Sequence, residues 1–191
     1  MNLIARAAAI IARPRAEWPR IAEEEPNIAA IYLFYVMPLA AIPAIASAFG
    51  ASLVGIALPG MGVIRMEPGQ AFVSGAFQYA MQLATIYVMA LVLAWLAPRY
   101  GGSGDRASAF KVVAYAWTPA WLAGLFNLMP ALSFLTLLGL YAVYLIYTGL
   151  PALMNVPQRR ALMVTALLVL IGITLSALIG ALIGLIGLAR V

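Results

Sequence analysis

Few side chains in this chain of 191 residues could carry out acid–base, nucleophilic or redox chemistry. The sequence contains no histidine and no cysteine, so it lacks the commonest general base and the usual zinc and haem ligands. Its long apolar runs hold no Asp, Glu or Arg, and Lys111 stands at the edge of one of them. Proton relays need ionisable groups at membrane depth. We therefore predict no catalytic residue, no metal ligand and no cofactor, and we do not expect an enzyme.

Polar and aromatic residues inside the apolar runs are the remaining candidates for a site. Gln78 and Gln82 lie four residues apart, which places them on one face of a helix. They predict either a hydrogen bond between helices or the polar wall of a path for a substrate. The aromatic residues predict either tight packing or a pocket for a lipid chain. The candidate lipid or ligand groove comprises Gln78, Gln82, Tyr115, Trp117, Thr118, Trp121, Tyr141 and Tyr144.

The composition explains why so little chemistry is available. Hydrophobic residues make up 65% of the chain and charged residues 9%, whereas soluble domains are about 45–50% apolar. A domain of this size cannot bury so much apolar surface, so the excess must face lipid. This excludes a cytosolic enzyme. The net charge of +5 is interpreted as a signal of membrane topology, and because no basic cluster occupies a soluble face, no nucleic-acid partner is expected.

Four runs are long enough to cross a bilayer, which takes about 20 residues as a helix. The run 112–154 is uncharged and too long for one crossing, and Pro130 marks the turn within it. The segment 51–64 is short and rich in Gly and Pro, so it is expected to be an external or re-entrant loop. The predicted fold is an all-α bundle of five transmembrane helices, at about 28–49, 70–97, 112–129, 131–154 and 161–189.

Lys and Arg residues favour one side of this arrangement. Nine of the 11 fall in the segment 1–27 and in the loops 98–111 and 155–160, while Arg65 and Arg190 fall on the other side. A sixth span at 51–64 would make the split nearly even. Because cytoplasmic loops carry the excess of basic residues, we predict a cytoplasmic N-terminus and an external C-terminus for the membrane domain 28–191.

Residues 1–27 are predicted to be a cytoplasmic segment with a short amphipathic helix. Apolar residues recur at positions 3, 4, 7, 10 and 11, and Arg6 and Arg13 fall opposite them. This favours a helix in the headgroup layer with its arginines towards phosphate. Glu23–Glu25 predict either a solvated helix end or a docking strip for a basic partner, such as another protein or the loop that carries Arg159 and Arg160.

The last predicted span carries small residues at every fourth position. Such a ribbon allows close approach of another helix, either within the bundle or from a second copy of the chain. Its members are Gly172, Ser176, Gly180 and Gly184.

Aromatic, glycine and proline residues recur in a pattern that covers residues 10–185. The pattern consists of Tyr115–Pro119, Trp121, Leu122, Gly124, Pro130, Tyr141, Tyr144, Tyr147–Pro151, Met154 and Pro157, preceded by Pro14, Trp18 and Pro38. It resembles the bacterial inner-membrane branch of the Yip family of multi-span membrane proteins. The resemblance implies a cytoplasmic N-terminus and five spans. Eukaryotic members are linked to Rab GTPases, vesicle traffic and membrane shaping, but this chain lacks their Asp-Leu-Tyr-Gly-Pro element and long cytoplasmic arm.

We therefore predict a non-catalytic membrane protein that organises membrane or partner proteins through membrane shaping or lipid contact. The alternative is a conduit or transporter for a lipid or small amphiphile. Gln78 and Gln82 discriminate between the two functions: a position across a cavity from Tyr115 and Trp121 favours the conduit. Expected partners are membrane lipids, a second copy at the last span and a protein at the N-terminal segment. The expected location is a bacterial inner membrane.

Overall fold

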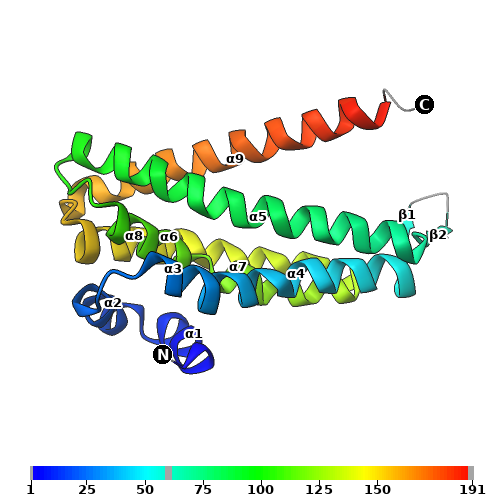
Figure 1. The fold of residues 1–191 in the computed structure, drawn as a ribbon, viewed down its shortest axis with the longest axis horizontal. Coiled ribbons are helices and arrows are strands. Elements are labelled where there is room, and N and C mark those ends of the chain that lie inside the picture. Colours follow the sequence, from blue (N-terminus) through cyan, green and yellow to red (C-terminus); the bar gives the residue numbers. More distant parts are fainter. Residues whose placement is uncertain (1, 59–61, 189–191) are drawn as a thin grey trace.

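The computed structural model describes residues 2–58 and 62–188, and they form an elongated helical bundle (Figure 1). In chain order the elements are α1 (Leu3–Ala12), α2 (Pro14–Glu23), α3 (Ile28–Ile31), the π-helix η1 (Tyr32–Val36), α4 (Met37–Phe49), the π-helix η2 (Gly50–Val54), β1 (Ile56–Leu58), β2 (Gly62–Ile64), α5 (Pro68–Leu96), the 3-10 helix η3 (Ala97–Tyr100), α6 (Arg106–Ala116), α7 (Thr118–Ala123), the 3-10 helices η4 (Gly124–Leu128) and η5 (Pro130–Leu140), α8 (Tyr141–Met154) and α9 (Gln158–Leu188).

Four helical segments of the described chain are long and apolar enough to cross a membrane. They are Ile28–Val54, Pro68–Tyr100, Ala131–Met154 and Gln158–Ala177. The predicted all-α membrane bundle is therefore confirmed. The predicted span at 112–129 differs, because it is divided between α6, α7 and η4. These pieces still run the length of the bundle. Lys111 lies beside Glu24 at one end, and the Asn127 carbonyl lies against Gly50 at the other.

Prolines account for the irregular helices. Pro38 has no N–H and its ring clashes with the carbonyl four residues earlier, so an α-helix cannot pass through it undistorted. The wider π-helical turn of η1 immediately precedes it. The ring of Pro119 likewise clashes with the carbonyl of Tyr115. The helix is interrupted at Trp117, between α6 and α7. The Thr118 hydroxyl donates a hydrogen bond to the Tyr115 carbonyl at 2.7 Å, which replaces the bond that Pro119 cannot make.

The segment 51–64 contains the end of η2 and a two-stranded antiparallel ribbon. β1 pairs with β2 in the register Ile56 opposite Ile64. Figure 1 places this ribbon at one end of the bundle, next to the start of α5. We call this the hairpin end.

The opposite end gathers the basic loops, and we call it the basic end. The loop after η3 packs on the loop between α8 and α9: the Ser103 N–H donates to the Met154 carbonyl at 2.7 Å. Arg99 and Arg160 belong to these loops, and α6 begins there with its cap Asp105. Hydrogen bonds from Ser108 hold the pKa of Asp105 below its usual range.

α1 and α2 do not extend away from the bundle. α2 packs on α8 and α1 contacts α6 and α7, so the pair lies along the half of the bundle towards the basic end (Figure 1). Trp18 is 1% exposed and its ring covers Gly149. The Trp18 indole N–H donates to the Thr148 hydroxyl at 3.0 Å. The α1–α2 pair is therefore part of the folded core.

Gly149 provides a test of this docking. A Cβ atom there would lie 2.9 Å from the Trp18 ring, whereas a Cβ atom at Gly172 would meet the flexible end of Met89 at 3.2 Å. We predict that Gly149→Ala destabilises the protein in detergent by about 1–3 kcal/mol. The matched change Gly172→Ala should leave thermal unfolding unchanged or raise its midpoint, since alanine favours the helix. Equal midpoints for the two variants would contradict close packing of α2 on α8.

Candidate functional site

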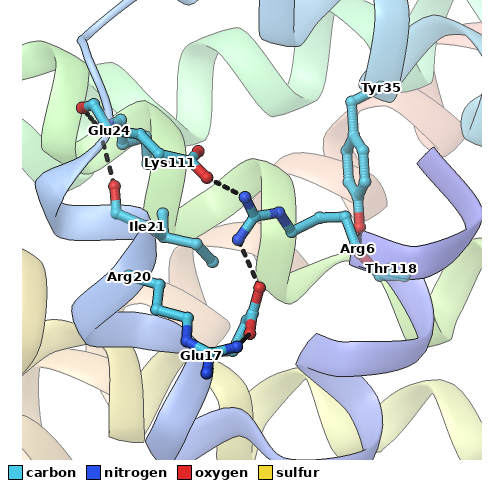
Figure 2. Close-up of polar contacts among 8 residues, drawn as sticks. All are labelled: Arg6, Glu17, Arg20, Ile21, Glu24, Tyr35, Lys111 and Thr118. Atoms are coloured by element: carbon cyan, nitrogen blue, oxygen red, sulfur yellow. Dashed lines mark hydrogen bonds and ion pairs between the residues drawn. The ribbon is translucent and has the colours of Figure 1, made fainter. Parts of the chain in front are cut away.

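A cluster of charged residues is buried between α1, α2 and α6 (Figure 2). The Arg6 guanidinium pairs with the carboxylates of Glu17 and Glu24. Only 11% of the Arg6 side chain and 8% of the Glu17 side chain are exposed. On the outer edge of the cluster, Arg20 Nη1 lies 3.6 Å from Glu17 Oε2. Arg6 thus ties its own helix to both ends of α2.

Lys111 reaches the same cluster from α6. Its Nζ donates to the carbonyl of Ile21 at 2.9 Å and to that of Glu24 at 2.5 Å. These carbonyls belong to the C-terminal turn of α2, where the helix has no partners of its own and carries partial negative charge. Lys111 is 4% exposed, and it acts as a C-terminal cap on α2 rather than reaching out to the lipid surface.

Aromatic and hydroxyl groups lie beneath the cluster. Arg6 Cζ lies 5.8 Å from the centre of the Tyr115 ring, in cation–π geometry. The Tyr35 and Thr118 hydroxyl oxygens lie 2.7 Å apart and are buried (Figure 2). Because Thr118 gives its only hydroxyl proton to the Tyr115 carbonyl, Tyr35 is the donor in this pair. The break at Pro119 is thereby connected to η1 and to the charged cluster.

A third contact fixes the junction of α1 and α2. The Tyr141 hydroxyl donates to the Ile11 carbonyl at 3.1 Å. The Tyr141 and Tyr144 rings stack on each other with their centres 5.4 Å apart. Together with the Trp18 contact, this anchors the α1–α2 pair to α8 independently of the charges.

The chemistry of this cluster is structural. Each charged group in it is paired or bound to a carbonyl, and breaking a buried ion pair costs about 3–5 kcal/mol because one charge is left without its partner. Among the described residues, no group of three or more acidic side chains is placed to hold a metal ion. The arrangement is suited to locking two helices against a bundle.

The structure corrects the predicted orientation of Arg6. Arg6 points inward to Glu17 and Glu24, not towards phosphate, while Ile4 is 76% exposed. The physical reason is that the inward carboxylates of α2 offer Arg6 a paired site out of water. Glu24 is thus bound within the chain, and Glu23 and Glu25 are exposed.

The sequence of α2 contains a pattern that indicates a buried charged cluster. Glu17, Ile21 and Glu24 recur at helical spacing, on the same side as Trp18. Carboxylates that flank an apolar stripe indicate that the stripe is buried next to a cation. The partner Arg6 could not be found from spacing alone, because it lies on a separate helix.

The predicted groove residues do not gather around one cavity. Gln78 is exposed and Gln82 is half-buried on α5. Tyr115 and Thr118 lie under the charged cluster, and Tyr141 and Tyr144 lie against α1, as described above. Trp121 is buried, and its indole N–H has no hydrogen-bond partner among the described residues.

Trp117 lines a separate cavity of about 580 Å³. The cavity lies between α5, the Trp117 break, η5, α8 and α9, and its walls are almost wholly apolar. Gly172 and Ser176 of the predicted small-residue ribbon also line it. Gly180 and Gly184 fall outside the residues whose side chains are described.

Comparisons with known proteins agree with this architecture. A Yip1 domain is recognised over residues 8–186. The chain is 26% identical over 168 residues to the "Inner membrane protein YohC" of Escherichia coli strain K12, with 86% of each chain covered. The same protein of E. coli O6:H1 matches equally well. No solved structure matches the chain.

The family match spans the α1–α2 pair from residue 8 onwards, all the membrane-crossing helices and most of α9. The resemblance predicted from the Tyr, Trp, Gly and Pro pattern is therefore confirmed, and the chain belongs to the Yip1 domain family.

Proposed function

We propose that this chain is a non-catalytic protein of a bacterial inner membrane that shapes the lipid around it through its docked N-terminal helices. The location follows the name of its E. coli relative, an inner membrane protein. The proposal that it lacks catalysis rests on the absence of His and Cys from the sequence. It also rests on the structural use of Lys111, whose Nζ is bound to carbonyls of α2.

The observation that carries this proposal is the one-sided position of the α1–α2 pair. The two helices lie along the bundle only in the half towards the basic end (Figure 1). They widen the protein in that half, which corresponds to one leaflet. The ion pairs of Arg6 lock α1 to α2, and hydrogen bonds of Lys111, Trp18 and Tyr141 hold the pair on the bundle, so the extra width is rigid. A rigid wedge in one leaflet favours a curved membrane.

The outer surface of the pair is suited to contact with lipid. Ile4 is largely exposed, and Arg13 and Arg15 are exposed at the junction of the two helices. An apolar side chain beside arginines fits the boundary between acyl chains and phosphate. Anionic headgroups would strengthen this contact by about 1 kcal/mol per basic residue.

We predict that the full-length protein reduces the diameter of vesicles made of phosphatidylethanolamine and phosphatidylglycerol, in proportion to the protein-to-lipid ratio. Electron cryomicroscopy of reconstituted vesicles measures the diameters. Arg6→Gln should weaken the effect, because Glu17 then lacks its partner and α1 is no longer fixed to α2. Arg159→Gln removes the same charge from an exposed position outside the α1–α2 pair and should retain the effect.

Hydrogen exchange of the same samples shows whether Arg6→Gln acts through docking. Amides of α1 should lose protection in this variant while those of α5 keep it. Vesicles of unchanged size with the wild-type protein would disprove membrane shaping. An equal loss of curvature in Arg6→Gln and Arg159→Gln would show that charge at the surface, and not docking, produces the effect.

We further propose that the basic end is cytoplasmic, since nine of the 11 Lys and Arg residues lie in the segments that meet there. A reporter enzyme that is active only outside the cytoplasm should then be active when fused after Val191 and silent when fused before Met1. The same result at both ends, whether active or silent, would mean that the segment 106–128 does not cross the membrane. The reverse pattern would invert the topology.

The conduit remains the second candidate function, because the bundle contains the cavity lined by Trp117. Gln78 is exposed and the cavity walls offer little polar surface, so a charged headgroup has no polar path through the protein. We predict no loss of dithionite-protected fluorescent lipid beyond that of protein-free vesicles. Rapid loss that Gln78→Leu with Gln82→Leu abolishes would favour the conduit over membrane shaping.

A further inference from the structure

The cavity between α5, α8 and α9 has the character of a ligand site. Its volume of about 580 Å³ lies in the range of pockets that hold small ligands. Its floor is formed by fully buried apolar side chains, including Met89 at 1% and Leu168 at 0% exposed. We call this cavity the apolar slot.

The walls of the apolar slot have almost no free polar group to offer. The Ser176 hydroxyl donates to the Gly172 carbonyl within α9 at 2.9 Å. Water is not stabilised in a site that gives it too few hydrogen bonds, and apolar cavities of this kind stay dry and accept apolar guests. The occupant must therefore be a hydrocarbon.

The slot opens onto the surface that faces lipid. Leu140 and Ile173 line it and are 65% and 62% exposed. They continue the exposed apolar surface of η5 and α9, where Leu137 and Leu170 are also exposed. An acyl chain in the bilayer can therefore enter the slot from the side without leaving an apolar environment.

The size of the slot favours an acyl chain over a helix of a second copy. An α-helix with its side chains is about 10–12 Å across, so a cavity of about 580 Å³ would admit only single side chains of such a helix. A flexible hydrocarbon chain is much narrower. Its gain is van der Waals contact with walls that otherwise have no partner atoms, because lipid tails are as apolar as the slot.

From the depth, dryness and lateral opening of the slot, we propose that it holds one acyl chain of a membrane phospholipid between α5, α8 and α9. The site stands apart from the α1–α2 pair, so it does not rest on the proposed membrane shaping. It makes the protein a lipid-binding protein with a specific intramembrane site.

A photoreactive lipid tests this site. The full-length protein is reconstituted with phosphatidylethanolamine that carries a diazirine near the end of one acyl chain, then irradiated, and the adducts are located by mass spectrometry. We expect adducts on Trp117 and Val143, which line the slot and are half-buried. Exposed Leu162 and Leu170 should be labelled by bulk lipid and serve as the internal reference.

Two variants fill the slot from neighbouring positions of α9. Gly172→Leu and Val169→Phe should remove the adducts on Trp117 and Val143 while keeping those on Leu162 and Leu170. Ala166→Leu adds the same bulk to an exposed position of α9 and should change nothing. Two filling variants are used because either one alone could disturb the contact of α9 with α5.

The inference is overturned if adducts form only on exposed residues outside the slot, or if filling the slot leaves the adducts on Trp117 and Val143 unchanged. It is also overturned if native mass spectrometry in nanodiscs shows a dimer and the slot is unlabelled, because a second copy would then cover it. Success of this experiment with unchanged vesicle diameters would establish the lipid site without membrane shaping.

Discussion

The ion pairs of Arg6 with Glu17 and Glu24 determine how the two N-terminal helices sit against each other, and Lys111 joins α2 to the membrane bundle. Buried charges are tolerated only when each has a partner, and a bilayer supplies none in its hydrocarbon region. Once Arg6 is buried over the Tyr115 ring, α2 must bring its carboxylates to it and Lys111 must reach the end of α2. The position of α1 and α2, and hence the one-sided width of the protein, follows from satisfying these charges.

The same requirement explains the interior of the bundle. Pro119 removes a backbone hydrogen bond, and the Thr118 hydroxyl replaces it. Tyr35, which lies in the π-helical turn η1 before Pro38, donates to the same Thr118 hydroxyl. Two prolines on different helices thus produce one buried polar network, and this network lies directly under the charged cluster. The irregular helices are the part of the fold that positions the docking site.

Much of the architecture could be predicted from the sequence because hydropathy and the charge of loops act over whole segments. The limits of the spans at 70–97 and 131–154 and the family resemblance follow from such signals. The break at Trp117 could not be placed, since Pro119 alone does not tell a kink from an interruption. Arg6 was assigned to the headgroups because periodicity treats each helix alone, whereas its partners lie on α2. The apolar slot was missed for a related reason: its walls come from segments far apart in the chain, and none of its residues is unusual in its own helix.

The two lipid contacts proposed for this protein rest on different interactions. At the α1–α2 pair, arginines and an exposed isoleucine meet the boundary of headgroups and acyl chains, where charge and apolar surface both find partners. In the apolar slot, Thr85 and Ser176 are the polar side chains among the described wall residues, and hydrocarbon restores the missing contacts. Both contacts lie outside the buried polar network of Tyr35, Tyr115 and Thr118, which remains closed within the protein. A bundle whose buried charges are paired internally leaves its apolar surfaces free to act on lipid, and this division of roles is why a chain without histidine or cysteine can still have a specific function.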